Sequence, residues 1–233
     1  MSFDNLVFFG SIKTAKNCLR IILKNLKFKK LLVVTETKKK YNFVKKYAKK
    51  KNLSYCSLKE FEKNINKKNK YDLGFSIRYN KIFKNKLINK FKFGIINLHG
   101  GDLPKYRGTS SHIFAIANQE KKFGCSLHFV NKKIDSGRIL KVKYFKINKK
   151  ESGYSLLNKG FKNGEILLNN FTKNLSKTKV FPKGRINQNN KGKNYTFEKL
   201  KILKTKFVLN DKNINLNLVK RALYHPEKKN YGL

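Results

Sequence analysis

Cysteine is scarce in this chain of 233 residues. Cys18, Cys56 and Cys125 are odd in number, lie far apart and show no Cys-x-x-Cys spacing. This pattern argues against a disulfide framework and against a zinc site, and we expect no other metal. A chain of this length buries a sizeable core without such crosslinks. Free cysteines suit a reducing compartment, so we expect a cytoplasmic protein.

Long apolar runs are also missing from the sequence. No stretch reaches the roughly 18 to 20 residues that a helix needs to span a bilayer. The opening residues 1–5 lack the basic start of a signal peptide. The sequence therefore predicts a protein that is neither inserted in a membrane nor exported.

Acidic residues are few: 13 Asp and Glu face 56 Lys and Arg, for a formal net charge of +43. Such a charge, taken alone, suggests nucleic acid or an anionic membrane as a partner. However, the lysines are spread along the whole chain, whereas a dedicated binding arm would concentrate them. Lys, Asn, Ile, Phe and Tyr also share AT-rich codons, so a biased genome explains the composition. We favour a solvated Lys-rich surface and keep a basic RNA-binding module as the alternative.

The first half of the chain alternates short apolar runs with longer amphipathic stretches, which is typical of parallel strands joined by helices. Such a sheet binds ligands at the carboxyl ends of its strands. The expected strands are residues 6–9, 31–35, 73–77 and 94–98, and the expected helices are residues 13–24, 38–50 and 81–90.

The second half continues the same core and then changes character. The pattern predicts helices over 111–118 and 153–175 and strands over 125–130 and 139–147. Residues 182–193 are rich in Gly, Asn and Lys and indicate a loop or linker. We therefore expect a catalytic domain over residues 1–180, with residues 181–233 as linker and short C-terminal appendage.

Two polar residues interrupt the end of one apolar strand. Asn97 and His99 are separated by one residue, so their side chains lie on the same side of the strand and can converge on one atom. Gly100 and Gly101 follow and leave room for a ligand. Considered alone, the pair is more often a hydrogen-bonded core pair than a catalytic one.

A second polar turn, residues 134–138, leads into the strand at residue 139. Asp135 in this turn has the ordinary interpretation of an aspartate that bonds its own backbone. His128 falls on an expected strand, and we interpret it as structural. We identify no partner for His112 or His225.

Taken together, these motifs resemble the formyltransferases that use N10-formyltetrahydrofolate. The matching pattern is Asn-x-His, a Leu-Pro loop, a short helix, a Gly-x-x-x-His strand over residues 124–128, and Asp-x-Gly at residues 135–137. Asp135 follows His99 by 36 residues, the spacing of that family. The family includes glycinamide ribonucleotide, methionyl-tRNA and sugar N-formyltransferases. The resemblance implies an α/β, Rossmann-like formyltransferase fold with a mostly parallel sheet flanked by helices.

The resemblance also implies roles for three residues. Asn97 would donate a hydrogen bond to the formyl oxygen as it gains negative charge. His99 would be the general base for the attacking amine, and Asp135 would orient His99 or a water. N10-formyltetrahydrofolate would be the cosubstrate. Its expected binding residues are Ser76, Ile77, Arg78, Tyr79, Ile134 and Gly137.

The sequence offers more than one candidate for the acceptor amine. The Tyr-Arg-Gly ending at residues 106–108 resembles the methionyl-tRNA and sugar branches of the family. Residues 194–233 are too short for the C-terminal barrel of methionyl-tRNA formyltransferases, and residues 218–226 resemble the end of sugar N-formyltransferases. We therefore expect a nucleotide-linked amino sugar of surface polysaccharide or lipopolysaccharide synthesis, with tRNA or glycinamide ribonucleotide as alternatives. The expected acceptor-binding residues are Gly100, Gly101, Asp102, Tyr106 and Arg107.

The role of Asp102 stays open, since it would either contact the acceptor or cap the turn before Pro104. The sequence also leaves open whether the C-terminal tail supports a homodimer.

Overall fold

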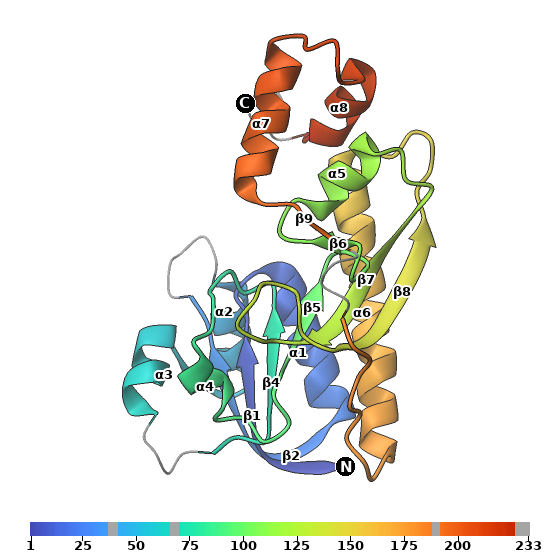
Figure 1. Ribbon diagram of the computed structural model, residues 1–233. Helices are drawn as coiled ribbons and strands as arrows, with labels where there is room; N and C mark the ends of the chain where they lie inside the picture. Colours follow the sequence, from blue (N-terminus) through green and yellow to red (C-terminus); the bar gives the residue numbers. More distant parts are fainter. Residues whose placement is uncertain (37–41, 66–69, 188–191, 227–233) are drawn as a thin grey trace.

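The fold is centred on one seven-stranded sheet of order β3-β2-β1-β4-β5-β7-β8 (Figure 1). The computed structural model describes residues 1–36, 42–65, 70–187 and 192–226. The first five strands in this order are parallel, and β7 and β8 are antiparallel to their neighbours. The strands of the sheet are β1 Ser2–Phe9, β2 Lys27–Val34, β3 Ser54–Cys56, β4 Leu73–Ile77, β5 Ile95–His99, β7 Lys122–Phe129 and β8 Ile139–Lys146.

Both faces of the sheet are buried, and successive side chains of a strand point alternately into the two cores. In β1, Leu6 and Phe8 belong to the larger core under α1 and α6, whereas Val7 and Phe9 belong to the core on the opposite face with Phe61 of α3. Figure 1 shows α1 and α6 together on one side of the sheet and α3 and α4 on the other. The helices are α1 Lys13–Asn25, α2 Phe43–Lys50, α3 Leu58–Asn64, α4 Asn85–Ile88, α5 Ser111–Ala117, α6 Gly153–Lys177, α7 Phe197–Val208 and α8 Leu216–Leu223.

The predicted α/β class with a mostly parallel sheet is confirmed. The strand over 73–77 has the predicted bounds, and α1 and α6 end within two residues of theirs. The helix expected over 38–50 begins at Phe43, with residues 37–41 outside the described ranges.

One predicted helix is wrong. Residues 81–90 contain only the short α4, and the residues before it are not helical. Arg78 has a φ of 51°, and the ring of Phe83 turns inward to lie 4.7 Å from that of Phe9. Burial of this aromatic ring keeps the segment out of a regular helix and leaves it beside the carboxyl end of β4.

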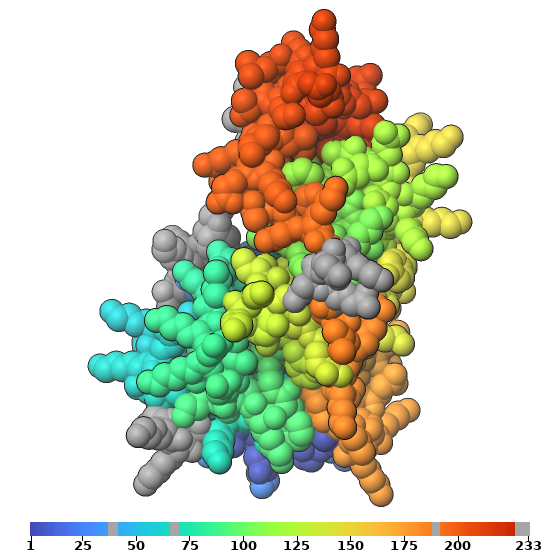
Figure 2. All heavy atoms as spheres, viewed as in Figure 1, coloured from blue at the N-terminus to red at the C-terminus, as the bar shows by residue number. Residues whose placement is uncertain are grey.

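The C-terminal helices pack against α5. Leu200 of α7 and Val219 of α8 pack together with Ile113 and Phe114 of α5. In Figure 2 the orange and red residues of the C-terminal part lie at one end of the molecule, and Figure 1 shows α5 next to α7 and α8 there. A division of the chain at residue 180 stays a prediction.

A second, two-stranded sheet joins β6 Tyr106–Arg107 to β9 Lys193–Asn194 in parallel. It connects the loop after β5 to the chain beyond α6. Within the described ranges, no helix has both the length and the apolar character needed to cross a membrane.

The core between the sheet and α6 gives a stability prediction. Leu168 is fully buried there, so we expect Leu168→Ala to lower the free energy of unfolding by about 2 to 5 kcal/mol, measured by urea denaturation. Leu209, which is 73% exposed, is the control, and Leu209→Ala should cost less than about 0.5 kcal/mol. Equal losses in the two variants would contradict this account of the core.

Candidate active site

A cavity of about 730 Å³ opens at the carboxyl ends of β4 and β5. This is where a parallel sheet gathers the loops that follow its strands. The cavity brings together residues that are distant in the sequence. Eight of the residues predicted to catalyse the reaction or to bind its substrates line it: Ser76, Arg78, Tyr79, Asn97, His99, Gly100, Ile134 and Asp135.

Strand β5 carries Asn97 and His99 to the cavity wall on one side of the chain, as their spacing predicts. β7 pairs with β5 in antiparallel register, which places His128 opposite Asn97. The Asn97 amide Nδ2 lies 2.9 Å from Nε2 of His128. His128 Nδ1 lies 2.8 Å from the carbonyl oxygen of Phe129, which only accepts, so Nδ1 carries the proton. Nδ2 of Asn97 can only donate, so its contact with Nε2 of His128 uses one of the two amide N–H groups when Nε2 carries no proton.

His99 is held by its other neighbours in one tautomer. Its Nε2 lies 2.7 Å from the carbonyl oxygen of Tyr106, so Nε2–H is the donor. In neutral His99 the lone pair then sits on Nδ1, which is 3.3 Å from Oδ2 of Asp135. Nδ1 is thus the atom that can take a proton, and the resulting imidazolium faces a carboxylate.

Asp135 contacts both histidines, His99 and His128, and the backbone of Gly108. Its Oδ2 accepts a hydrogen bond from the backbone N–H of Gly108 at 2.9 Å, and its Oδ1 lies 3.4 Å from Nε2 of His128. The backbone of Asp135 has a φ of 48°, in the left-handed region that few residues other than glycine adopt. A local conformation of this kind at a cavity wall marks a functional candidate.

The pKa values of His99 and Asp135 are both lowered, which favours the neutral form of the histidine and the ionised form of the aspartate. Burial lowers the pKa of His99, and the attraction of Asp135 only partly opposes this shift. Burial would raise the pKa of Asp135, but His99, His128 and the bond from Gly108 hold it well below its usual range. At neutral pH the cluster therefore contains a neutral imidazole next to an ionised carboxylate.

This arrangement predicts the titration of His99. Because its pKa is lowered from 6.5, we expect the His99 ring to stay neutral at pH 6.5 and to gain a proton only at lower pH. Histidine NMR titration of the folded protein measures this directly, with His99→Gln used to assign the signal. A midpoint at or above pH 6.5 would contradict it.

The residues predicted for the folate differ in their exposure to the cavity. Ser76, Arg78, Tyr79 and Ile134 line it, and the Arg78 guanidinium lies 5.0 Å from the centre of the Phe161 ring. Ile77 is fully buried in β4 and Gly137 does not line the cavity, so neither residue is presented to a ligand there. A side chain at position 137 would meet the carbonyl oxygen of Phe129, which accounts for the glycine.

Among the residues predicted for the acceptor, only Gly100 lines the cavity, and a side chain there would enter open space. Gly101 has a different reason to be glycine: a Cβ would lie 2.6 Å from Nε2 of His99 and would disturb its bond to Tyr106. The structure also buries Asp102 beside Gly124 of β7, and burial raises the pKa of Asp102 to about 6.

Tyr106 and Arg107 lie behind the cavity wall rather than on it. The Tyr106 ring stacks on Tyr195 with centroids 5.1 Å apart, and its hydroxyl donates to Glu120. The Arg107 guanidinium donates to Oδ1 of Asn187 at 2.9 Å. Both therefore support the loop after β5 from within.

His128, which the sequence leads us to interpret as structural, lines the cavity and contacts both Asn97 and Asp135. The alternation of Ser126 and His128 in an otherwise apolar strand was the available signal. His112, which had no identified partner, also lines the cavity, and burial lowers its pKa to about 3. Within the described ranges no group of three or more His, Cys, Asp or Glu side chains could hold a metal ion.

The fold and this site define an α/β protein with a polar cluster at the sheet's carboxyl edge. The family model for formyl transferases matches residues 5–171. The chain therefore belongs to the formyl transferase family.

Curated relatives agree with this assignment. The chain is 40% identical over 119 residues to the bifunctional polymyxin resistance protein ArnA of Wigglesworthia glossinidia brevipalpis, a match that covers 48% of this chain and 18% of that protein. It is 29% identical over 160 residues to the methionyl-tRNA formyltransferase of Finegoldia magna, covering 62% and 50%. The chain spans half or less of the length of these relatives.

Solved structures share the fold over most of the chain. An N-formyltransferase from Helicobacter canadensis has a TM-score of 0.75 at 23% identity and covers 94% of this chain and 80% of its own. A 4-N formyltransferase from Francisella tularensis has a TM-score of 0.73 at 20% identity, covering 97% and 90%. A glycinamide ribonucleotide transformylase from Symbiobacterium toebii reaches 0.64 at 14%, covering 79% and 93%. At these identities the likeness concerns the fold.

Proposed function

We propose that this chain transfers a formyl group from N10-formyltetrahydrofolate to a primary amine, and that the amine belongs to a nucleotide-linked amino sugar. The observation that carries the reaction is the pairing of His99 with Asp135, 3.3 Å apart, in a ligand-sized cavity that Asn97 also lines. A cavity of about 730 Å³ lies in the range of small-molecule sites.

The residues supply what acyl transfer needs. The amine nitrogen attacks the formyl carbon, and the bond from that carbon to N10 breaks. Nδ1 of His99 takes the proton that the amine loses and returns it to the departing N10, so no proton is gained or lost overall. The ionised Asp135, 3.3 Å away, stabilises the imidazolium while it exists.

Asn97 is suited to the charge that develops on the formyl oxygen. Its bond to His128 fixes the amide, and the second N–H of Nδ2 can donate to that oxygen. His128 thereby sets the direction of the donor. It adds a residue to the three that the motif predicted.

The folate as cosubstrate is supported by relatives of the same fold. The Helicobacter canadensis enzyme is described in complex with folinic acid and dTDP-3-aminofucose, and another structure is described as a sugar 3N-formyl transferase in the presence of dTDP and 5-N-formyl-THF. Both cover 94% of this chain. A match over 94% of the chain extends beyond the catalytic domain expected over residues 1–180, which favours the sugar acceptor.

A tRNA acceptor is the second candidate, because several curated relatives are named methionyl-tRNA formyltransferase, one of them 35% identical over 86 residues. The structural neighbours named for glycinamide ribonucleotide cover 75% to 79% of this chain, less than the sugar enzymes do. A cytoplasmic location and a role in surface polysaccharide synthesis belong to the same proposal.

Mass spectrometry decides between these acceptors. The purified protein is incubated with N10-formyltetrahydrofolate and, separately, nucleotide-linked 3-amino and 4-amino sugars, initiator methionyl-tRNA and glycinamide ribonucleotide. Addition of one formyl group to an amino sugar supports the proposal, and addition only to methionyl-tRNA or the ribonucleotide rejects the sugar. Binding of RNA that is steeply salt-dependent, with no transfer to any amine, would favour the basic RNA-binding module instead.

A further inference from the structure

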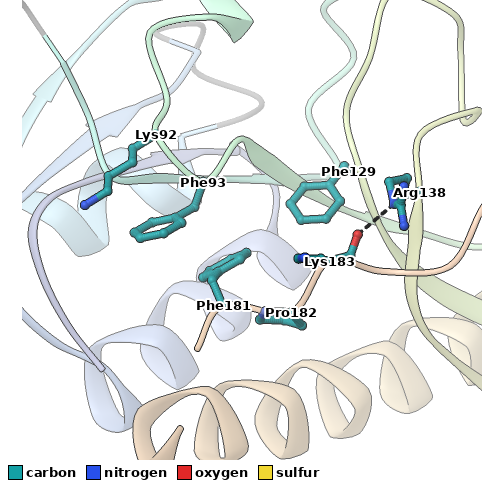
Figure 3. A pocket seen from close by; sticks show the side chains of 7 residues that line it. All are labelled: Lys92, Phe93, Phe129, Arg138, Phe181, Pro182 and Lys183. Atoms are coloured by element: carbon teal, nitrogen blue, oxygen red, sulfur yellow. Dashed lines mark hydrogen bonds between the residues drawn. The ribbon is translucent and has the colours of Figure 1, made fainter. Parts of the chain in front are cut away.

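The chain beyond α6 returns along the sheet and is fixed there before it reaches the cavity. The Phe181 ring stacks on Phe93 with centroids 4.7 Å apart, and the Arg138 guanidinium donates to the carbonyl oxygen of Lys183 at 2.8 Å (Figure 3). Arg185 then exchanges two backbone hydrogen bonds with Ile139.

Asn187 is the next side chain of this segment to point into the protein, and it is only 5% exposed. Its Nδ2 donates to the backbone carbonyl oxygens of Asp135, at 3.0 Å, and of Gly137, at 3.1 Å. Its Oδ1 accepts from Arg107 at 2.9 Å. One amide therefore uses both N–H groups and its oxygen to join two loops that are far apart in the sequence.

The two bonds to carbonyls hold the turn on which Asp135 depends. Asp135 has a φ of 48°, a conformation that costs an L-residue energy and persists only where the surroundings hold it. Asn187 fixes the backbone of that turn, and the N–H of Gly108 fixes its carboxylate. The third bond of Asn187 goes to the guanidinium of Arg107, the residue before Gly108, and so ties the same amide to the loop that carries the donor of the carboxylate.

We propose that Asn187 is a positioning residue for Asp135, which it holds with Oδ2 facing Nδ1 of His99. This inference rests on the proposed formyl transfer, because in that reaction the carboxylate acts on His99. Asn187 lies outside the motifs from which the site was predicted and outside the matched family region, residues 5–171.

The test is a pair of variants measured in two backgrounds. Asn187→Ala removes all three hydrogen bonds, and Asn187→Asp keeps the acceptor for Arg107 while it removes both donors. We expect either to lower kcat by roughly 10- to 100-fold, the scale of a small misplacement in a site, with a smaller change in KM. In an Asp135→Asn background the same replacements should have little further effect, because residues that act as a unit are not additive.

Asn25 offers a matched control. Its Nδ2 also makes three contacts, two with Asn169 and one with Thr172, and it links α1 to α6 away from the cavity. Asn25→Ala should leave kcat unchanged. A purely structural role for Asn187 would instead lower kcat equally in both backgrounds, and that result overturns the proposal.

A second readout does not require turnover. In Asn187→Ala, Asp135 no longer stays beside His99, so the pKa of His99 should fall further below that of the unaltered protein, as followed by NMR. An unchanged or raised pKa overturns the proposal. If the unaltered protein transfers no formyl group, the proposed function fails, and this titration alone decides the role of Asn187.

Discussion

Replacement of His99 by glutamine is expected to lower kcat by roughly 10²- to 10⁴-fold, the range of general acid–base catalysis. Glutamine can keep the donation to the carbonyl oxygen of Tyr106, now made by His99 Nε2 at 2.7 Å. It has no atom that accepts a proton at neutral pH, so the base is lost while the packing is retained. Single-turnover rates of formyl transfer measure the effect.

His225 provides the control for this substitution. It lies against Tyr154, with ring centroids 4.6 Å apart, near the C-terminal end of the described chain. His225→Gln should change kcat by less than about twofold. If His99→Gln, shown to be folded by circular dichroism, transferred formyl at the unaltered rate, His99 would not be the base.

The second large effect is expected from Asp135→Asn, which preserves shape and removes one negative charge. The imidazolium of His99 would lose the carboxylate 3.3 Å from its Nδ1, so we expect kcat to fall by roughly 10²- to 10⁴-fold. The amide oxygen can still accept from Gly108, which limits the structural change.

The direction of a pKa change separates this mechanism from a loss of folding. Asp135 raises the pKa of His99, so its neutralisation should move the NMR midpoint of His99 to lower pH. Asp4→Asn is the control, since Asp4 is exposed and paired with Lys29 at 2.8 Å far from the cavity. A fall in kcat with an unchanged His99 midpoint would mean that Asp135 acts by another route.

The sequence predicted the elements whose signal is local. The apolar run at residues 73–77 and the amphipathic periods of α1 and α6 correspond closely to the observed elements. Short elements such as β3 and α3, and the unwound stretch before α4, escaped prediction. Their conformation depends on burial against other elements, as the inward turn of Phe83 illustrates.

In the candidate site, too, local signals predicted some features and tertiary contacts decided the others. By itself the sequence determined that Asn97 and His99 share one side of a strand end, because side chains alternate along a strand, and that an aspartate follows at a fixed spacing.

Only the tertiary structure decided the remaining contacts. Antiparallel pairing of β7 brought His128 to Asn97, and the chain beyond α6 brought Asn187 to Asp135. Folding also withdrew Tyr106 behind the cavity wall. These contacts join residues far apart in the sequence, so they depend on strand order, register and chain path, which no local pattern of residue types specifies.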